Sequence, residues 1–376
     1  MDLKEIRNEI DEIDAELVKL FEKRMSTVRK VAEYKIENNM PIFNSKRERE
    51  IISSLTSKVE PELSTYTKIL YNTLFDVSRS YQAQAIYKTS PVTERIQTAL
   101  EQTPKMFPSS ATVACQVTEG AYSQQACEKL FYNPTIVYLD SFSGVFEAVK
   151  SGMCSYGILP LENSVQGTVT QVMDLMSKYD FSIVKSAKIQ VNHALLAKKS
   201  DAKITEVFSH PQALSQCDEY LNKMGVKVTV YDNTAMAAKM VSESDRDDIA
   251  AISSPRCAEL YGLKIVNDSI ANSDNNHTRF ICISKKPEIY PGADRISFRI
   301  SLSHKPGALY ALISKFTAVG INLTKIESRP IPGKDFEFMF YFDMSVSVYS
   351  EELMSIITEL SIENDSFKLL GAYSEV

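Results

Sequence analysis

The first 36 residues carry an apolar repeat that constrains the fold more than any other part of the chain. Between Leu3 and Ile36 the apolar residues recur at gaps of four and three, as in Ile6, Ile10, Ile13, Leu17 and Leu20. This spacing predicts one amphipathic helix, which at about 1.5 Å per residue is roughly 50 Å long. In a small helical domain, only a similar helix from a second chain can cover so long a stripe. Two further patterns predict helices over 46–57 and 63–87, so residues 1–90 are expected to be all-helical.

One position of this apolar repeat is occupied by a cation. The rhythm that includes Leu20 continues to Arg24, and Lys35 lies just beside the end of the stripe. A cation at a core position costs several kcal/mol unless an anion meets it, which leaves an internal Glu or a bound anionic ligand. Arg7 lies seventeen residues before Arg24, about 25 Å along a rigid helix, too far to hold the same small molecule. It can instead complete the site of a second chain.

The next two helices add polar groups to this set. Arg47 and Glu48 open the second helix, and Ser78 and Gln82 share one face of the third at positions i and i+4. The set comprises several cations, one carboxylate, one hydroxyl and one amide, and it contains no nucleophile. Such a pocket suits a dianionic substrate that rearranges without forming a covalent bond to the enzyme. The alternative is a coiled-coil dimerisation module whose cations have no ligand.

Four segments of this region, "IRNEIDEIDAELVKLFEKR", "VAEYK", "MPIFNSKRERE" and "SRSYQ", resemble the all-helical chorismate mutases. The resemblance implies a site for chorismate built from Arg24, Lys35, Asn44, Arg47, Glu48, Ser78 and Gln82, with Arg7 from the partner subunit. In that reaction Lys35 and Gln82 would donate hydrogen bonds to the ether oxygen as it gains charge, and arginines would hold the two carboxylates.

The pattern changes after residue 110. Residues 88–110 contain Pro91, Pro104 and Pro108 and are expected to form a linker or an edge segment. Beyond it, short apolar runs alternate with amphipathic stretches over 111–286, which is typical of an α/β domain. Residues 181–199 read as two strands with no helix between them, as expected where a chain crosses between two lobes.

Four polar segments lie at junctions of these elements, where open α/β sheets bind ligands: "TEGAYSQQA", "LPLENS", "FSHPQALSQC" and "NNHTRF". In this order they resemble prephenate dehydratase, which implies a two-lobed domain similar to periplasmic binding proteins. The implied catalytic residues are Glu162, Asn163, Ser209, Gln216 and Thr278, with Ser123 and Arg279 at the substrate prephenate. Thr278 would hydrogen-bond or protonate the leaving hydroxyl, with Glu162 as a candidate relay. The segment "CQVTEGAYS" lacks the Gly-Pro usual before its acidic residue, which leaves the loop's shape open.

Residues 285–294 read as a hinge, and 295–376 as a βαββαβ ferredoxin-like sandwich with a turn at 329–335. "HKPGALYALI" and "IESRPIPG" resemble the ACT domain fused to prephenate dehydratases. The resemblance implies feedback inhibition by L-phenylalanine. The implied effector residues are Gly307, Ala308, Leu309, Asn322, Glu327 and Ser328.

Composition narrows the other possibilities. The net charge is −6 and the basic residues are spread along the chain, which argues against nucleic acid as a partner. No apolar run approaches the roughly 20 residues of a membrane span, and the charged amino terminus is unlike a signal peptide. Six single cysteines with no CxxC pair predict buried thiols, no metal and no cofactor.

The three resemblances together imply a multidomain bifunctional enzyme of phenylalanine biosynthesis, with an all-α domain, a two-lobed α/β domain and an α+β domain. We expect a cytoplasmic protein that forms at least a homodimer. The remaining alternative is an amino-acid-binding regulatory protein whose catalytic sites have decayed.

Overall fold

The structure is a computed structural model that describes residues 1–376 except 1, 39, 42, 274, 332 and 334–336. Two compact units make up the chain. The first contains Met1–Arg95 and Phe298–Lys368, and the second contains Ile96–Ser297 and Leu369–Val376.

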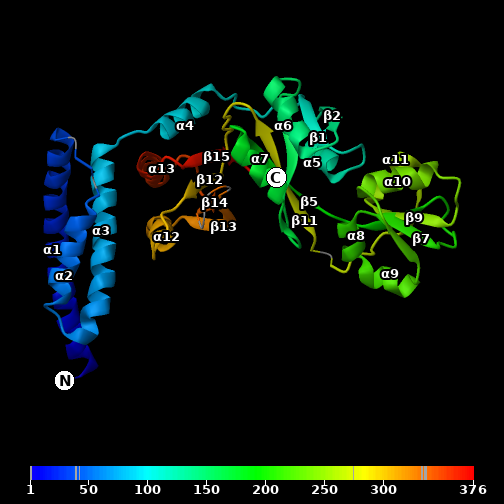
Figure 1. The fold of residues 1–376 in the computed structure, drawn as a ribbon. Helices are drawn as coiled ribbons and strands as arrows, with labels where there is room; N and C mark the ends of the chain where they lie inside the picture. Colours follow the sequence, from blue (N-terminus) through cyan, green and yellow to red (C-terminus); the bar gives the residue numbers. More distant parts are fainter. Residues whose placement is uncertain (1, 39, 42, 274, 332, 334–336) are drawn as a thin grey trace. The chain divides into compact units, whose positions relative to one another are not determined.

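The amino-terminal part of the first unit is helical, as predicted. It consists of α1 (Leu3–Glu37), α2 (Ser45–Thr56), a short 3₁₀ turn (Pro61–Leu63) and α3 (Ser64–Ile86). Asp2 begins α1 with a capping box, because its side chain accepts from the Glu5 N–H while the Glu5 carboxylate accepts from the Asp2 N–H. Figure 1 shows α1 and α3 side by side along much of their length.

The apolar stripe of α1 is uncovered in the single chain. Ile10 is 51% exposed and Leu17 is 54% exposed, whereas the residues of α1 that are buried are Met25 and Ala32. Exposed apolar side chains at this spacing leave one face of α1 uncovered, and its pairing with a second helix stays a prediction.

The carboxy-terminal part has the predicted βαββαβ order. Its elements are β12 (Arg295–Ser301), α12 (Ala308–Ala318), β13 (Asn322–Pro330), β14 (Phe338–Ser345), α13 (Glu351–Glu363) and β15 (Lys368–Tyr373). The strands run in the order β13-β14-β12-β15, which is that of a ferredoxin-like sandwich. The boundary between the units passes through β12 and β15. Within the expected turn at 329–335, β13 continues to Pro330, and residues 332, 334 and 335 lie outside the described residues.

The linker predicted for residues 88–110 is wrong over half its length, because α4 (Pro91–Gln102) is a helix. Pro91 occupies its first turn, where a missing N–H costs nothing. Ser90 and Thr93 exchange backbone-to-hydroxyl hydrogen bonds of 2.8 and 3.2 Å that cap the helix. Ile96 and Ala99, one turn apart, are buried. The prolines suggested a linker, but one of them, Pro91, is the first residue of a short amphipathic helix.

The second unit has two lobes, as predicted. The sheet of the first lobe runs β5-β11-β3-β1-β2, and that of the second runs β10-β6-β9-β7-β8. The first-lobe elements are β1 (Thr112–Gln116), α5 (Tyr122–Leu130), β2 (Thr135–Leu139), α6 (Phe142–Ser151), β3 (Tyr156–Asn163), β4 (Gly167–Thr168), α7 (Thr170–Lys178), β5 (Ser182–Gln190) and β11 (His277–Ser284). The second-lobe elements are β6 (Ala194–Ala197), β7 (Glu206–Ser209), α8 (Pro211–Gln216), α9 (Asp218–Met224), β8 (Lys227–Val230), α10 (Thr234–Glu243), β9 (Ile249–Ser253), α11 (Pro255–Tyr261) and β10 (Lys264–Asn267).

The chain crosses between the lobes twice, from β5 to β6 and from β10 to β11. At these crossings the backbones touch, since the Val191 N–H donates to the Asn276 carbonyl at 2.7 Å. In the sheet of the first lobe, β11 lies between β3 and β5 and pairs antiparallel with both. This pairing brings the end of β3 beside the start of β11.

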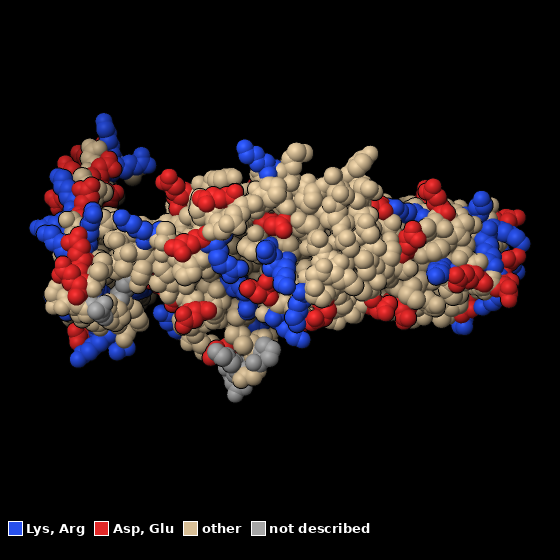
Figure 2. Space-filling model, turned by 90° about the horizontal axis from the view of Figure 1, so that it is seen from above, with Lys and Arg blue, Asp and Glu red and all other residues tan. Residues whose placement is uncertain are grey.

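All six cysteines are free thiols and all are buried, as expected. No helix in the described part of the chain is long and apolar enough to span a membrane. On the face drawn in Figure 2, acidic and basic side chains are interspersed, and the described residues form no continuous basic surface there.

Candidate functional sites

Two pairs of predicted residues meet between α1 and α3, and we call them the helical site: Arg24 with Ser78, and Lys35 with Gln82. The Arg24 guanidinium donates to the Ser78 hydroxyl and, at 3.4 Å, to the Leu74 carbonyl. The Lys35 ammonium donates to Gln82 Oε1 at 3.3 Å. Ser78 and Gln82 are both buried, because their i, i+4 spacing turns them toward α1.

Glu48 is held beside this group by Arg79, which was not among the predicted site residues. Arg79 forms ion pairs with Glu48 and Asp76, and its guanidinium lies 5.3 Å from the centre of the Phe43 ring. Burial lowers the pKa of Lys35, and the nearby Glu48 carboxylate partly offsets this shift. Arg79 lies inside the segment "SRSYQ", next to Ser78. Its place in this segment is the one feature of the sequence that could have indicated a role for Arg79 in the site.

Three predicted residues lie elsewhere in the single chain. The Arg7 side chain is exposed on α1. The Arg47 side chain is 68% exposed, with Nη1 3.8 Å from Glu50 Oε2. Asn44 caps α2, since its side chain accepts from the Arg47 N–H at 3.1 Å. The contacts of the described residues therefore assemble only part of the predicted set around Arg24.

In the second unit, Asn163 and Thr278 form the centre of what we call the cleft site, and Asn163 is joined to Gln216 of the second lobe through Asn276. Asn163 and Thr278 are directly opposed across β3 and β11, and Asn163 Nδ2 donates to Thr278 Oγ1 at 3.0 Å. Both residues are at least nine-tenths buried. Because this bond uses Thr278 as acceptor, the hydrogen of its hydroxyl can point to another group.

Glu162 and Arg279 form the next cross-strand pair, with Glu162 Oε1 3.0 Å from Arg279 Nε. Neighbouring residues on a strand point to opposite faces of a sheet, so Glu162 is directed away from the face that carries Asn163 and Thr278. The geometry thus gives no support to Glu162 as a proton relay to Thr278. It assigns Arg279 a cross-strand ion pair.

Two more predicted residues lie in the second lobe, Ser209 at the end of β7 and Gln216 at the end of α8. Ser209 is fully buried and its hydroxyl donates to the Ile252 carbonyl at 2.6 Å, a bond that holds two neighbouring strands. Gln216 Oε1 accepts from Asn276 at 3.0 Å and lies 2.8 Å from His193 Nε2. Asn276 and His193 were not among the predicted site residues, although "NNHTRF" contains the first of them.

Ser123 lies in the first turn of α5, where free backbone N–H groups favour an anion. Its hydroxyl donates to the Gln116 carbonyl at 2.9 Å, so it closes the loop that precedes the helix. His210 caps α8 by accepting from the Gln212 N–H at 3.3 Å. This contact agrees with a turn-stabilising role for His210.

The loop that lacks the usual Gly-Pro is strained at Val117. Its φ of 82° makes it the one non-glycine residue with a positive φ in the described part of the chain. A β-branched side chain rarely adopts this conformation, which costs roughly 1–3 kcal/mol. The Val117 N–H donates to the Leu139 carbonyl at 2.8 Å, which holds the backbone in place.

Val117→Gly is expected to stabilise the protein by about 1 kcal/mol, because relief of the strain exceeds the entropy cost of glycine. In a unit of this size, the melting temperature should rise by about 2–4 °C in a thermal unfolding scan. Val230→Gly, on the exposed strand β8, is the matched control and should lower it. An unchanged or lower melting temperature for Val117→Gly would show that the loop is not strained.

The residues proposed for an effector lie at the start of α12 and along β13. Gly307 precedes α12 with φ 84°, a left-handed conformation that glycine adopts without strain. The Glu327 carboxylate lies 3.4 Å from the Lys325 ammonium, while Ser328 is exposed. Glu327 and Ser328 are adjacent on the strand and point to opposite faces.

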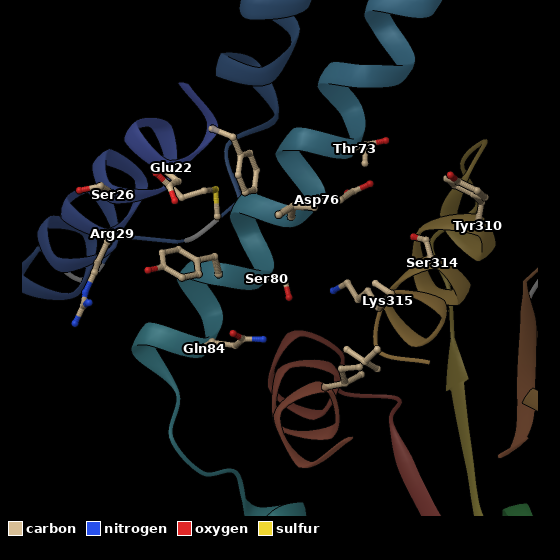
Figure 3. A pocket seen from close by; sticks show the side chains of 17 residues that line it. Glu22, Ser26, Arg29, Thr73, Asp76, Ser80, Gln84, Tyr310, Ser314 and Lys315 are labelled. Carbon is tan, nitrogen blue, oxygen red and sulfur yellow. The ribbon is translucent and has the colours of Figure 1, made fainter. Parts of the chain in front are cut away.

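A cavity of about 850 Å³ in the first unit is lined by α1, α3, α12 and α13. Figure 3 shows Glu22, Ser26 and Arg29 of α1, Thr73, Asp76, Ser80 and Gln84 of α3, and Tyr310, Ser314 and Lys315 of α12 around it. On α3 these residues lie on the helix face opposite Ser78 and Gln82. The cavity is therefore distinct from the helical site.

No cluster of three or more potential metal ligands occurs among the residues that the structure describes. The helical site consists of two cations, a hydroxyl and an amide beside the Glu48 carboxylate, and the cleft site consists of amides and hydroxyls. Such groups bind and orient anions and supply hydrogen bonds.

Comparison with known proteins gives two family matches on this chain. The model of chorismate mutase type II matches residues 6–83, and that of prephenate dehydratase matches residues 113–288. A bifunctional chorismate mutase/prephenate dehydratase of Aquifex aeolicus is 31% identical over 99% of this chain and 98% of its own length. An arogenate dehydratase/prephenate dehydratase of Arabidopsis thaliana is 34% identical over 78% of this chain and 81% of its own.

Among solved structures, the prephenate dehydratase of Arthrobacter aurescens in complex with L-Phe aligns with a TM-score of 0.64 and 24% identity. The alignment covers 70% of this chain and 89% of that one, and it shows a shared fold. The matches in sequence extend along nearly all of the chain and include both sites described above. The chain therefore belongs to the family of bifunctional chorismate mutase/prephenate dehydratases.

Proposed function

We propose that this protein converts chorismate to prephenate at the helical site and prephenate to phenylpyruvate at the cleft site, as two steps of phenylalanine biosynthesis. The observation that carries the proposal is the presence in one chain of two separate polar sites, Lys35 with Gln82 and Asn163 with Thr278. The domains are assigned as residues 1–90 for the mutase, 111–286 for the dehydratase and 295–376 for an ACT regulatory domain.

In the mutase step, an ether C–O bond breaks while a C–C bond forms, and the ether oxygen gains negative charge in the transition state. Lys35 and Gln82 donate hydrogen bonds to this oxygen, which stabilises that charge more than the ground state. Arg24 binds a substrate carboxylate, with Ser78 beside it, and Glu48 accepts from the substrate hydroxyl while Arg79 orients it. No covalent intermediate is needed.

Completion of the mutase site requires a second copy of the chain. The exposed apolar residues of α1 favour pairing with the same helix of a partner. Arg7 is exposed on this helix, about 25 Å from Arg24, so Arg7 of the partner subunit is the residue we assign to the second carboxylate. The proposed assembly is thus at least a homodimer.

In the dehydratase step, prephenate loses its ring hydroxyl as water and its ring carboxylate as carbon dioxide. The electrons of the broken C–C bond enter the ring, and the hydroxyl takes up one proton. Thr278 donates its hydroxyl hydrogen toward the leaving oxygen, because Asn163 already occupies an acceptor position on Thr278. Glu162 is left out of this step, since it pairs with Arg279 on the other face.

The regulatory part of the proposal is inhibition by L-phenylalanine through the carboxy-terminal domain. The N–H groups at the start of α12 can donate hydrogen bonds to the amino acid's carboxylate, and Asn322 can bind its ammonium group. A cytoplasmic location is also part of the proposal, because six free thiols fit a reducing compartment.

Glu327→Ala and Ser328→Ala are expected to raise the phenylalanine concentration for half-inhibition by about 10-fold, a coupling loss typical of an effector site. The dehydratase rate measured against phenylalanine concentration tests this. Thr317→Ala, an exposed hydroxyl on α12, is the control and should leave the inhibition curve unchanged. Normal inhibition of both variants would place the effector site elsewhere.

The catalytic proposal is tested by giving the purified protein chorismate, prephenate and arogenate separately. We expect turnover of the first two. Turnover of arogenate but not prephenate would reassign the second site to the activity for which the Arabidopsis relative is also named. Phenylalanine binding without turnover of any substrate would favour the regulatory protein with decayed sites.

A further inference from the structure

A chain of hydrogen-bonded amides joins the two lobes at the crossings between them. It begins at Asn163, whose Oδ1 accepts from the backbone N–H groups of Val165 at 3.0 Å and Gln166 at 3.1 Å. Because these donors hold the oxygen, Nδ2 must point the other way. It faces Asn276 Oδ1 at 2.7 Å and Thr278 Oγ1 at 3.0 Å.

The orientation of the Asn163 amide determines that of Asn276, which in turn determines that of Gln216 in the second lobe. Since Asn276 Oδ1 accepts from Asn163, its Nδ2 is free to donate, and it does so to Gln216 Oε1 at 3.0 Å. His193 Nε2 lies 2.8 Å from the same oxygen. A carbonyl oxygen only accepts, so His193 must carry its hydrogen on Nε2.

His193 and Asn276 are almost fully buried, at 4% and 2% exposure. Burial lowers the pKa of His193, although the bond to Gln216 opposes this, and the neutral ring is favoured. The Tyr122 ring packs edge-on against it, with 6.5 Å between ring centres. Two donors from different segments therefore fix one oxygen of Gln216.

The other end of the Gln216 amide has no such partner. Gln216 Nε2 is buried and makes no hydrogen bond within the described part of the chain, and the same is true of His193 Nδ1. A buried amide NH₂ without an acceptor is unfavourable in a resting protein. It is expected where a ligand supplies the acceptor.

We propose that His193 and Asn276 are positioning residues of the dehydratase, which hold the Gln216 amide so that its Nε2 donates to a carboxylate oxygen of the substrate. The inference rests on the proposed function of the cleft site. If either donor is lost, the amide can turn over and present its oxygen to the carboxylate, which repels it. His193 and Asn276 thus act through Gln216 and do not touch the reacting atoms.

His193→Leu is expected to lower kcat/KM for prephenate by about 10- to 100-fold, mainly through a higher KM, because one oriented donor to an anion is lost. His193→Gln restores a donor near the position of Nε2 and should stay within about 3-fold of the wild type. The mutase rate of the same samples reports on folding and should be unchanged.

Asn276→Asp tests the second donor, because it keeps the acceptor for Asn163 and places an oxygen against Gln216 Oε1. The same loss of kcat/KM is expected. Each change is then repeated in a Gln216→Ala background, where a residue that acts through Gln216 causes no further loss.

Four results would overturn the inference: wild-type kinetics in His193→Leu, wild-type kinetics in Asn276→Asp, no rescue by His193→Gln, or losses that add fully to that of Gln216→Ala. Full additivity would mean that the two residues only support the fold. A wild-type protein without dehydratase turnover would instead overturn the proposed function, so the two failures are distinguishable.

Discussion

Arg24→Ala is expected to lower the chorismate mutase rate by on the order of 10³-fold, while the dehydratase rate stays at the wild-type level. The guanidinium stands on the apolar side of α1, donates to Ser78 and is assigned to a carboxylate of chorismate. Removal of one oriented donor from a site that works by electrostatic stabilisation costs roughly 3–4 kcal/mol. Chorismate consumption and phenylpyruvate formation from added prephenate measure the two rates.

Arg29→Ala is the matched control for this prediction. Arg29 lies on the same helix but is largely exposed, and its guanidinium is 3.7 Å from Glu33. We expect wild-type mutase kinetics from this variant. If Arg24→Ala kept the mutase rate, the cation in the apolar repeat would have no part in catalysis.

Thr278→Ala is expected to have the opposite effect, with a dehydratase rate reduced by about 10²- to 10⁴-fold and an unchanged mutase rate. The alanine cannot donate to the leaving hydroxyl, and it removes an acceptor of Asn163. Thr278→Ser keeps the hydroxyl and should recover most of the rate. Phenylpyruvate formation from prephenate is the measurement.

The control for Thr278 is Thr135→Ala, an exposed threonine at the start of β2. It should behave as the wild type. Full activity of Thr278→Ala would remove this hydroxyl from the chemistry. A loss in Thr278→Ser as large as in Thr278→Ala would mean that the methyl group, and not the hydroxyl, supports the site.

Much of this architecture could be predicted because it depends on local pattern. The 3.6-residue periodicity predicted α1 to within one residue, and the short apolar runs predicted strands β3 and β11. Asn163 and Thr278 could be predicted as site residues through their motifs. Their direct opposition on β3 and β11 could not, because register depends on the fold of both strands.

The features that could not be predicted depend on contacts between residues that lie far apart in the sequence. The resemblance implied Glu162 as a candidate relay, but the alternation of side chains along the strand directs it to Arg279 on the other face. His193 and Asn276 look unremarkable in sequence, and only the contact between the crossing segments brings them to Gln216. The helix α4 was missed because its prolines suggested a linker, although Pro91 fits the first turn.

The central claim is that one chain contains two complete activities, and conversion of chorismate alone by the purified wild-type protein tests it most directly. We predict that prephenate appears first and phenylpyruvate follows. A mixture of Arg24→Ala and Thr278→Ala proteins should restore the conversion that neither variant performs alone, because prephenate can diffuse from one to the other. A folded wild-type protein that binds phenylalanine but forms no phenylpyruvate from chorismate would contradict the account.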